Sequence, residues 1–429
     1  MRRASNPQKL FDVQETVLAN GLKVRLIPNP EVPVVSLHLI FQVGSRNERP
    51  GITGISHLFE HMMFNGAQRY GPKEFDRELE AAGGRSNAYT SNDLTVYYDD
   101  FASEALDKVL DLESDRMASL SLSDTSLASE REVVKEERRL RVDNEVMGMM
   151  DEELGSLVYK AHPYRWPVIG WMGDIENIQR SDCEQYFRTY YAPNNALMYV
   201  AGDFDPGTAL KSIRKHFGAI PKGLPLPPVI NSEPPQLGER RAEIGYPAQA
   251  PSLMLGYRGP KGSHPDTLAL DVLQFVLAVG DGSRLIRELV YRQQCVVALS
   301  VDWTWRLDDG MFVIVAELKP DSNVPKVEAA LERELAKAAS RRITASELEK
   351  AKNNLKSHLF RGLTTNNGLA HSLGTHEVFL GSWAEVFSVV ERYQAVTAED
   401  VRRVAEKYLS PSSRCVVTVV PRAPAEGTP

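Results

Sequence analysis

Hydrophobic and polar residues recur along the chain with two different periods, which predicts strands in some stretches and helices in others. Over residues 35–43, apolar side chains alternate with polar ones, a pattern typical of a half-buried strand. The dipeptide Asn20-Gly21 lies between two strand-like runs and predicts the tight turn of a β-hairpin. Further elements are expected as short helices at 73–82 and 103–118 and a strand at 87–98.

One pattern occurs twice: an aromatic residue, a proline three positions later, and then an apolar strand. The first copy begins at Tyr190 and leads into residues 196–200. The second begins at Tyr408, 218 residues further along, and leads into residues 415–420. A repeat at about half the chain length predicts two homologous domains.

The stretch between the two copies is rich in proline, which is typical of a linker. We therefore expect a first domain over residues 1–220, a linker over 221–240 and a second domain over 241–429.

Composition narrows the class of protein. The 429 residues are 42% hydrophobic and 25% charged, which predicts a globular chain. The net charge of −7 gives no basis for binding nucleic acid. No apolar run reaches 18 residues, so we expect no transmembrane helix and no membrane partner. The 3 cysteines are odd in number and far apart, so a disulfide framework is not expected.

Residues 57–61 read His-Leu-Phe-Glu-His, and the chain has only 9 histidines in all. On a helix, His57 and His61 lie one turn apart on the same face, with Glu60 beside them. Two imidazoles and a carboxylate supply two Zn²⁺ ligands and a base for a water molecule. Ser56 stands where it could cap the helix. A pair of purely structural histidines is the alternative.

A third ligand is expected from the charged helix over residues 129–140. Glu137 is spaced to share a face with Val133, Val134 and Leu140, and Glu130 lies two turns earlier on that face. Both carboxylates are therefore expected to point inward. The alternative is that they are surface residues, like most glutamates on so charged a helix.

The order H-x-x-E-H followed 76 residues later by Glu137 resembles the M16 metallopeptidase family. The segments 54–66 and 87–98 are similar to two further motifs of that family, and the resemblance covers nearly the whole chain. It implies that His57, His61 and Glu137 bind Zn²⁺ and that Glu60 activates water. Glu130 would contact a ligand rather than the metal and so support the site, and the strand at Asn87 and Ala88 would bind substrate.

The resemblance also implies an α+β fold of the LuxS/MPP-like metallohydrolase kind. In that fold two homologous domains, each an antiparallel-rich β-sheet backed by helices, form half of a clamshell. A second subunit closes the chamber, in which an unfolded peptide is held as an added β-strand and cleaved.

The second half departs from the family pattern. Its residues 267–277 stand where the metal helix should recur, but they contain no set of ligands. Active members carry an arginine and a tyrosine that hold the substrate, and those positions are Val290 and Val297 here. Arg284 and Tyr291 have the same spacing, but Arg284 belongs to the Ser-Arg-Leu turn that precedes the family's arginine, so this pair does not stand at the expected positions. We therefore expect a heterodimer with a homologous partner subunit, or a homodimer with Tyr291 or Arg292 substituting.

Two functions follow from these observations. The first is a zinc endopeptidase acting on unfolded peptides, and the alternative is a non-catalytic core or assembly subunit of a larger complex. The first ten residues contain two arginines but no apolar segment typical of a secretory signal. A bacterial cytoplasmic or periplasmic location is expected.

Overall fold

The computed structural model describes residues 11–230 and 232–422, and its contacts group them into two compact units. Unit 1 comprises residues 11–138, 166–230 and 362–387. Unit 2 comprises 139–165, 232–361 and 388–422. Each unit therefore includes one segment from the other half of the sequence, which a linear division into two domains does not contain.

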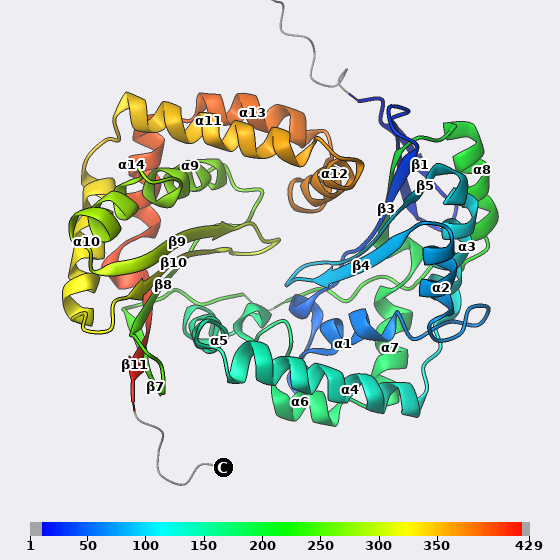
Figure 1. The fold of residues 1–429 in the computed structure, drawn as a ribbon, viewed down its shortest axis with the longest axis horizontal. Helices are drawn as coiled ribbons and strands as arrows, with labels where there is room; N and C mark the ends of the chain where they lie inside the picture. Colours follow the sequence, from blue (N-terminus) through cyan, green and yellow to red (C-terminus); the bar gives the residue numbers. More distant parts are fainter. Residues whose placement is uncertain (1–10, 231, 423–429) are drawn as a thin grey trace, which may run out of the picture. The chain divides into compact units, whose positions relative to one another are not determined.

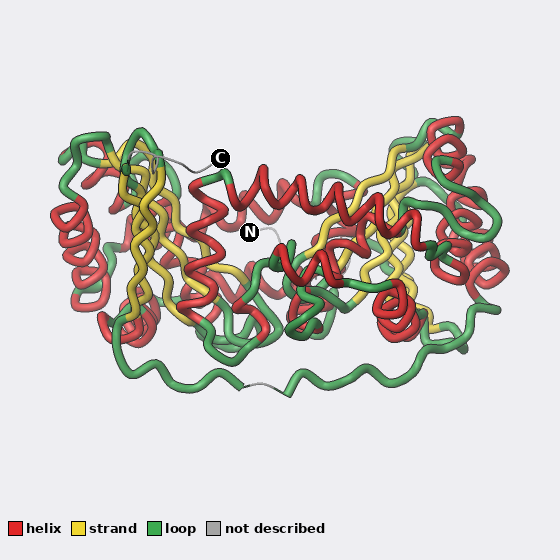
Figure 2. Tube along the Cα trace, turned by 90° about the horizontal axis from the view of Figure 1, so that it is seen from below, coloured by secondary structure: helices red, strands yellow, loops and turns green. Residues whose placement is uncertain are grey.

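The proline-rich stretch is without regular structure. Residues 221–230 and 232–237 form neither helix nor strand and are drawn as loop in Figure 2. The boundaries expected for the two domains and their linker stay a prediction.

Unit 1 contains a six-stranded sheet in the order β1-β2-β6-β3-β5-β4. Strands β2 and β6 are parallel, and every other neighbouring pair is antiparallel. The predicted hairpin is confirmed, because β1 pairs with β2 and Gly21 adopts a φ of 93° in the turn. The strands are β1 (Gln14–Val17), β2 (Lys23–Pro28), β3 (Val34–Phe41), β4 (Arg85–Thr90), β5 (Thr95–Ala102) and β6 (Ala196–Gly202).

Unit 2 repeats this arrangement without the first strand, in the order β7-β11-β8-β10-β9. The pair β7-β11, which corresponds to β2-β6 of unit 1, is parallel, and the remaining pairs are antiparallel. The two sheets thus confirm the α+β fold of two related domains that the sequence predicts. The strands are β7 (Arg240–Tyr246), β8 (Ser252–Arg258), β9 (Val296–Thr304), β10 (Met311–Leu318) and β11 (Arg414–Pro421).

Helices cover both faces of the first sheet. Arg116 of α3 lies 4.6 Å from the ring of Tyr97, on the face opposite to His38 and Ile40. The helix α12 packs on β3 and β6 from the His38 face. The helices of unit 1 are α1 (Ile55–Met62), α2 (Glu74–Ala81), α3 (Leu106–Ser119), α4 (Asp124–Arg138), α6 (Met172–Asn177), α7 (Arg180–Tyr190), α8 (Pro206–Phe217) and α12 (Asn366–Leu380), and Figure 1 shows α2, α3 and α8 together.

In unit 2 the helix α5 packs on β8 and β11, as α12 does on the corresponding strands of unit 1. Each sheet is therefore covered by a helix from the other half of the sequence. The helices of unit 2 are α5 (Val146–Val158), α9 (Thr267–Ala278), α10 (Val324–Ser340), α11 (Ala345–Gly362), α13 (Glu385–Ala395) and α14 (Ala398–Tyr408), where α11 and α13 reach the boundary between the units. None of the described helices is long and apolar enough to cross a membrane.

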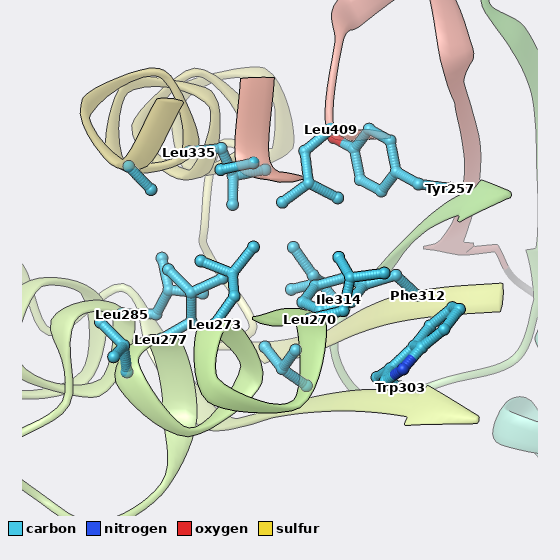
Figure 3. Packing of buried hydrophobic residues seen from close by; sticks show 14 of the residues in the cluster. Tyr257, Leu270, Leu273, Leu277, Leu285, Trp303, Phe312, Ile314, Leu335 and Leu409 are labelled. Atoms are coloured by element: carbon cyan, nitrogen blue, oxygen red, sulfur yellow. The ribbon is translucent and has the colours of Figure 1, made fainter. Parts of the chain in front are cut away.

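The main apolar core of unit 2 lies between its sheet and the helices α9, α10 and α14. Figure 3 shows Leu270, Leu273 and Leu277 of α9 close to Phe312 and Ile314 of β10. The side chains of this cluster are almost fully buried, so α9 serves as a core helix.

Two of the predicted strands differ from the structure. The strand β3 is buried on both faces rather than one, because α12 covers the side that carries His38, which is 1% exposed. The single strand expected at 87–98 is a hairpin of β4 and β5. Its chain reverses at residues 91–94, where Ser91 N–H donates to Leu94 O.

Candidate metal centre

The helix α1 presents His57, Glu60 and His61 from an otherwise buried segment. Leu58 and Phe59 are fully buried and fix the orientation of the helix. The two imidazole rings lie 4.9 Å apart, centroid to centroid, as the i, i+4 spacing requires.

The start of α1 is held by a residue that the sequence reading missed. Gly54 precedes the helix with a φ of 86°, and Glu48 accepts hydrogen bonds from the N–H groups of Gly54 (2.9 Å) and Ser56 (2.8 Å). The expected capping role of Ser56 is wrong, because Ser56 is already the second residue of α1 and its hydroxyl lies 2.6 Å from Tyr186 Oη. Burial raises the pKa of Glu48 to about 7, although these hydrogen bonds oppose the shift.

The helix α4 brings Glu130 and Glu137 to the same place, as the sequence predicts. The apolar residue that shares their face is Val134, which is fully buried. Val133 and Leu140 are exposed instead; Val133 lies within α4, and Leu140 lies in the π-helical segment Arg139–Asp143 that follows it.

The predicted ligands converge. Glu137 Oε2 lies 3.6 Å from His57 Nε2 and 3.3 Å from His61 Nε2. Ligand atoms on a tetrahedral Zn²⁺ ion with bonds of about 2.0–2.1 Å are about 3.3 Å apart. The two nitrogens and the oxygen are therefore spaced as a zinc site requires. Among the described residues, these three alone form a group with metal-ligand spacing.

Glu130 contacts the opposite nitrogen of one ligand. Its Oε2 lies 3.4 Å from His61 Nδ1, so it can fix the ring orientation and direct Nε2 towards Glu137. Burial opposes a charged imidazole, but Glu130 and Glu137 outweigh it and raise the pKa of His61 to about 9. The hydrogen bond between His61 and Glu130 in turn lowers the pKa of Glu130.

Glu60 lies on α1 beside His57 and His61, and a residue of the edge strand β4 contacts it. Thr90, the last residue of β4, donates its hydroxyl to Glu60 Oε2 at 2.6 Å. Thr90 belongs to the segment 87–98 that resembles a family motif, but only the hairpin turn brings it to α1. Sequence reasoning therefore gave it no role.

The strand β4 is an edge strand, since it pairs with β5 and with no other strand of the described chain. Asn87 and Ala88 lie in its middle, and Ala88 N–H donates to Asn87 Oδ1 at 2.8 Å. In a peptide that pairs with this edge, a main-chain carbonyl could replace Asn87 Oδ1 as the acceptor for the N–H group of Ala88.

The described residues of unit 2 form no metal-ligand group at α9, the helix that corresponds to α1. The two positions expected to carry the substrate-holding arginine and tyrosine are valines. Val290 packs against the apolar core, while Val297 is 59% exposed. Arg284 donates to both carboxylate oxygens of Glu347, at 2.7 and 3.0 Å. This pairing agrees with the view that the Arg284–Tyr291 spacing is incidental.

Comparisons with known proteins place this geometry in a family. Residues 23–170 match the model described as insulinase (peptidase family M16), and residues 177–355 match the one described as peptidase M16 inactive domain. The zinc protease PqqE of Helicobacter pylori is 31% identical over 95% of this chain and 93% of its own. The chain belongs to the M16 peptidase family.

Solved structures of the M16 kind agree with this assignment. A protease from Helicobacter pylori has a TM-score of 0.92 and 30% identity, covering 95% of this chain and 99% of its own. The periplasmic protease PqqL of Escherichia coli has a TM-score of 0.77 and 20% identity, which shows the fold alone. This chain covers 48% of PqqL, so it has the length of one half of that protein.

Proposed function

We propose that this chain is the zinc-bearing subunit of an endopeptidase that cleaves unfolded peptides. The observation that carries the proposal is that one potential ligand atom each of His57, His61 and Glu137 lie within 4.8 Å of one another. Glu60 lies on α1, the helix that also carries the two histidines. A Zn²⁺ ion held there would polarise the scissile carbonyl and acidify the attacking water.

The chain's own groups would do the remaining work. Glu60 would accept the proton of the attacking water and return it to the leaving amine. Thr90 would hold Glu60 in place through its hydroxyl. The open edge of β4 at Asn87 and Ala88 would bind the peptide by main-chain hydrogen bonds, which requires an extended and therefore unfolded substrate.

We further propose that a homologous subunit completes the enzyme. The chain has Val290 and Val297 where the family pattern has the substrate-holding arginine and tyrosine, and neither valine can donate a hydrogen bond. The length of one half of PqqL supports a paired arrangement. A homodimer using Tyr291 or Arg292 is the competing arrangement. The expected bacterial cytoplasmic or periplasmic compartment stays a prediction.

The test measures zinc content and cleavage of a fluorogenic peptide library by the chain alone and with a co-expressed homologous subunit. Glu60→Gln serves as the inactive control that retains all three ligands. One zinc per chain, with activity in the paired sample only, is the expected result. Activity from the chain alone would favour the homodimer. No zinc and no cleavage in either sample would favour the assembly subunit.

A further inference from the structure

A large cavity in unit 1 lies at the start of β4, the strand whose last residue, Thr90, lies beside the metal centre. Its volume is about 910 Å³, within the range of pockets that bind organic ligands. It is lined by residues of the loop before β3 and of the start of β3, of the start of β4, of the end of β5, and of the segment before α12 and its first turn. These include Asn29, Val32, Val34, Arg85, Asp100 and Asn366.

The edge strand connects this cavity to the proposed catalytic group. Thr90, at one end of β4, donates to Glu60, while Arg85, at the other end, lines the cavity. Five residue steps along a strand span about 17 Å. A peptide added to β4 pairs with it residue by residue. A substrate residue about five positions from the scissile bond therefore arrives opposite Arg85.

The charged groups at the cavity are largely paired with one another. Asp100 accepts from Arg85 Nη2 at 3.2 Å and from Asn367 Nδ2 at 3.1 Å. Asn29 Nδ2 donates to Asn366 Oδ1 at 3.0 Å. These contacts give Arg85 a partner, so a substrate carboxylate would have to compete with Asp100 for it.

The cavity also offers exposed apolar side chains beside its polar ones. Val32 is 55% exposed and Val34 is 42% exposed, although both are large hydrophobic side chains. Covering them with an apolar side chain is favourable by about 25 cal/mol for each Å² removed from water. Gly83 and Gly84 also line the cavity and add no side chain to fill it.

We propose that this cavity is a distal subsite that takes an apolar side chain of the substrate peptide, about five residues from the scissile bond. The inference rests on the proposed peptidase function and adds a length and a sequence preference to it. Peptides too short to reach Arg85 would bind through β4 alone.

The first experiment maps the bound peptide directly. A peptide carrying a photo-reactive phenylalanine analogue is bound to the Glu60→Gln chain in its assembled form, with the probe moved one position at a time from the scissile bond. We expect cross-links to residues 29–34 or 364–367 when the probe is about five positions away. Cross-links elsewhere from that position would overturn the subsite.

The second experiment compares substrates that differ in length and in one residue. We expect the active assembly to prefer leucine to aspartate at that position, and Val32→Asp to reduce the preference about tenfold. Val17→Asp is the matched control, because Val17 is 61% exposed but does not line the cavity. An unchanged preference in Val32→Asp would refute the subsite while leaving the peptidase proposal intact. Failure of the zinc-loaded assembly to cleave either peptide would refute both.

Discussion

Apart from β1, the two sheets have the same strand order, yet the helix that follows β3 in unit 1 serves a different purpose from the helix that follows β8 in unit 2. In unit 1 this helix is α1, which carries His57, Glu60 and His61. In unit 2 it is α9, whose leucines fill the core and whose buried polar groups include Asp271. The comparison shows that the topology positions a helix against the sheet edge, while a few side chains decide whether it can hold a metal.

The edge strands differ in the same way. Thr90 ends β4 opposite the first residue of β5, and Thr304 ends β9 opposite the first residue of β10. Thr90 donates to Glu60 of α1, whereas Thr304 donates to Asp302 of its own strand at 2.6 Å. Corresponding hydroxyl groups thus support the proposed catalytic base in one unit and only local structure in the other.

The largest expected effect comes from removing the proposed metal ligand on α4, Glu137. Glu137→Gln replaces a charged oxygen ligand by a neutral amide, so the chain should lose stoichiometric zinc and at least about 10³-fold in activity. Zinc content after dialysis and peptide cleavage measure this. Glu136→Gln is the matched control, since Glu136 is the exposed neighbour. Equal zinc content in the two variants would contradict the proposed ligand set.

A smaller effect on zinc affinity is expected from changing Glu130, which contacts a proposed ligand but is not one itself. Glu130→Gln removes the carboxylate that contacts His61 Nδ1, and the loss of such a partner typically costs about 10–100-fold in metal affinity. Competition with a chromogenic chelator measures the affinity. Glu132→Gln alters an exposed glutamate of the same helix that pairs with Lys135 and should leave zinc affinity unchanged. If both variants bind zinc equally, Glu130 has no supporting role.

The comparison of the two threonines predicts a still smaller and more selective effect. Thr90→Val should retain zinc and lower kcat about tenfold, because a hydrogen bond to a charged group is lost. Thr90→Ser should restore most of the activity. Thr304→Val is the control in unit 2 and should leave kcat unchanged. A change in KM alone would assign Thr90 to peptide binding rather than to Glu60.

Much of unit 1 is predictable because helical spacing is local. The i, i+4 spacing of His57 and His61, and the shared face of Glu130 and Glu137, follow from the sequence and recur in the structure. Glu48 and Thr90 could not be found in this way. Their contacts with α1 depend on a turn before the helix and on the hairpin at residues 91–94.

The exchanged helices show a second limit of sequence reasoning. The apolar face of α5, with Met150, Leu154 and Val158, indicates that the helix is buried, but not which sheet buries it. It packs on Met254 and Val417 of unit 2, although the sequence of α5 belongs to the first half. For the same reason the coverage of His38 by α12 was not expected.

The smallest expected effect on activity comes from a change that acts instead on the stability of unit 2. Burial raises the pKa of Asp271 from 3.8 to about 7, although hydrogen bonds from Tyr393 Oη (2.7 Å) and Trp305 Nε1 (3.1 Å) oppose the shift. The folded chain therefore keeps a proton that the unfolded chain releases between these two pH values. The contribution of Asp271 to stability is accordingly present below pH 3.8 and is lost as the pH rises to about 7.

Asp271→Asn should remove this dependence, because an amide cannot ionise, while its oxygen in the place of Oδ2 can still accept from Tyr393 Oη (2.7 Å) and Trp305 Nε1 (3.3 Å). Urea unfolding near pH 5 gives the reference difference in stability between the variant and the original chain. Between pH 5 and pH 7.5 that difference should shift by about 3 kcal/mol in favour of the variant, because the original chain loses stability until the pH reaches the pKa of about 7. Asp281→Asn, at an exposed position, is the control. A difference between Asp271→Asn and the original chain that stays constant with pH would mean that Asp271 is ionised in the folded chain. In that case α9 would hold a buried charge, and its contrast with the charged helix α1 would be smaller than the two cores indicate.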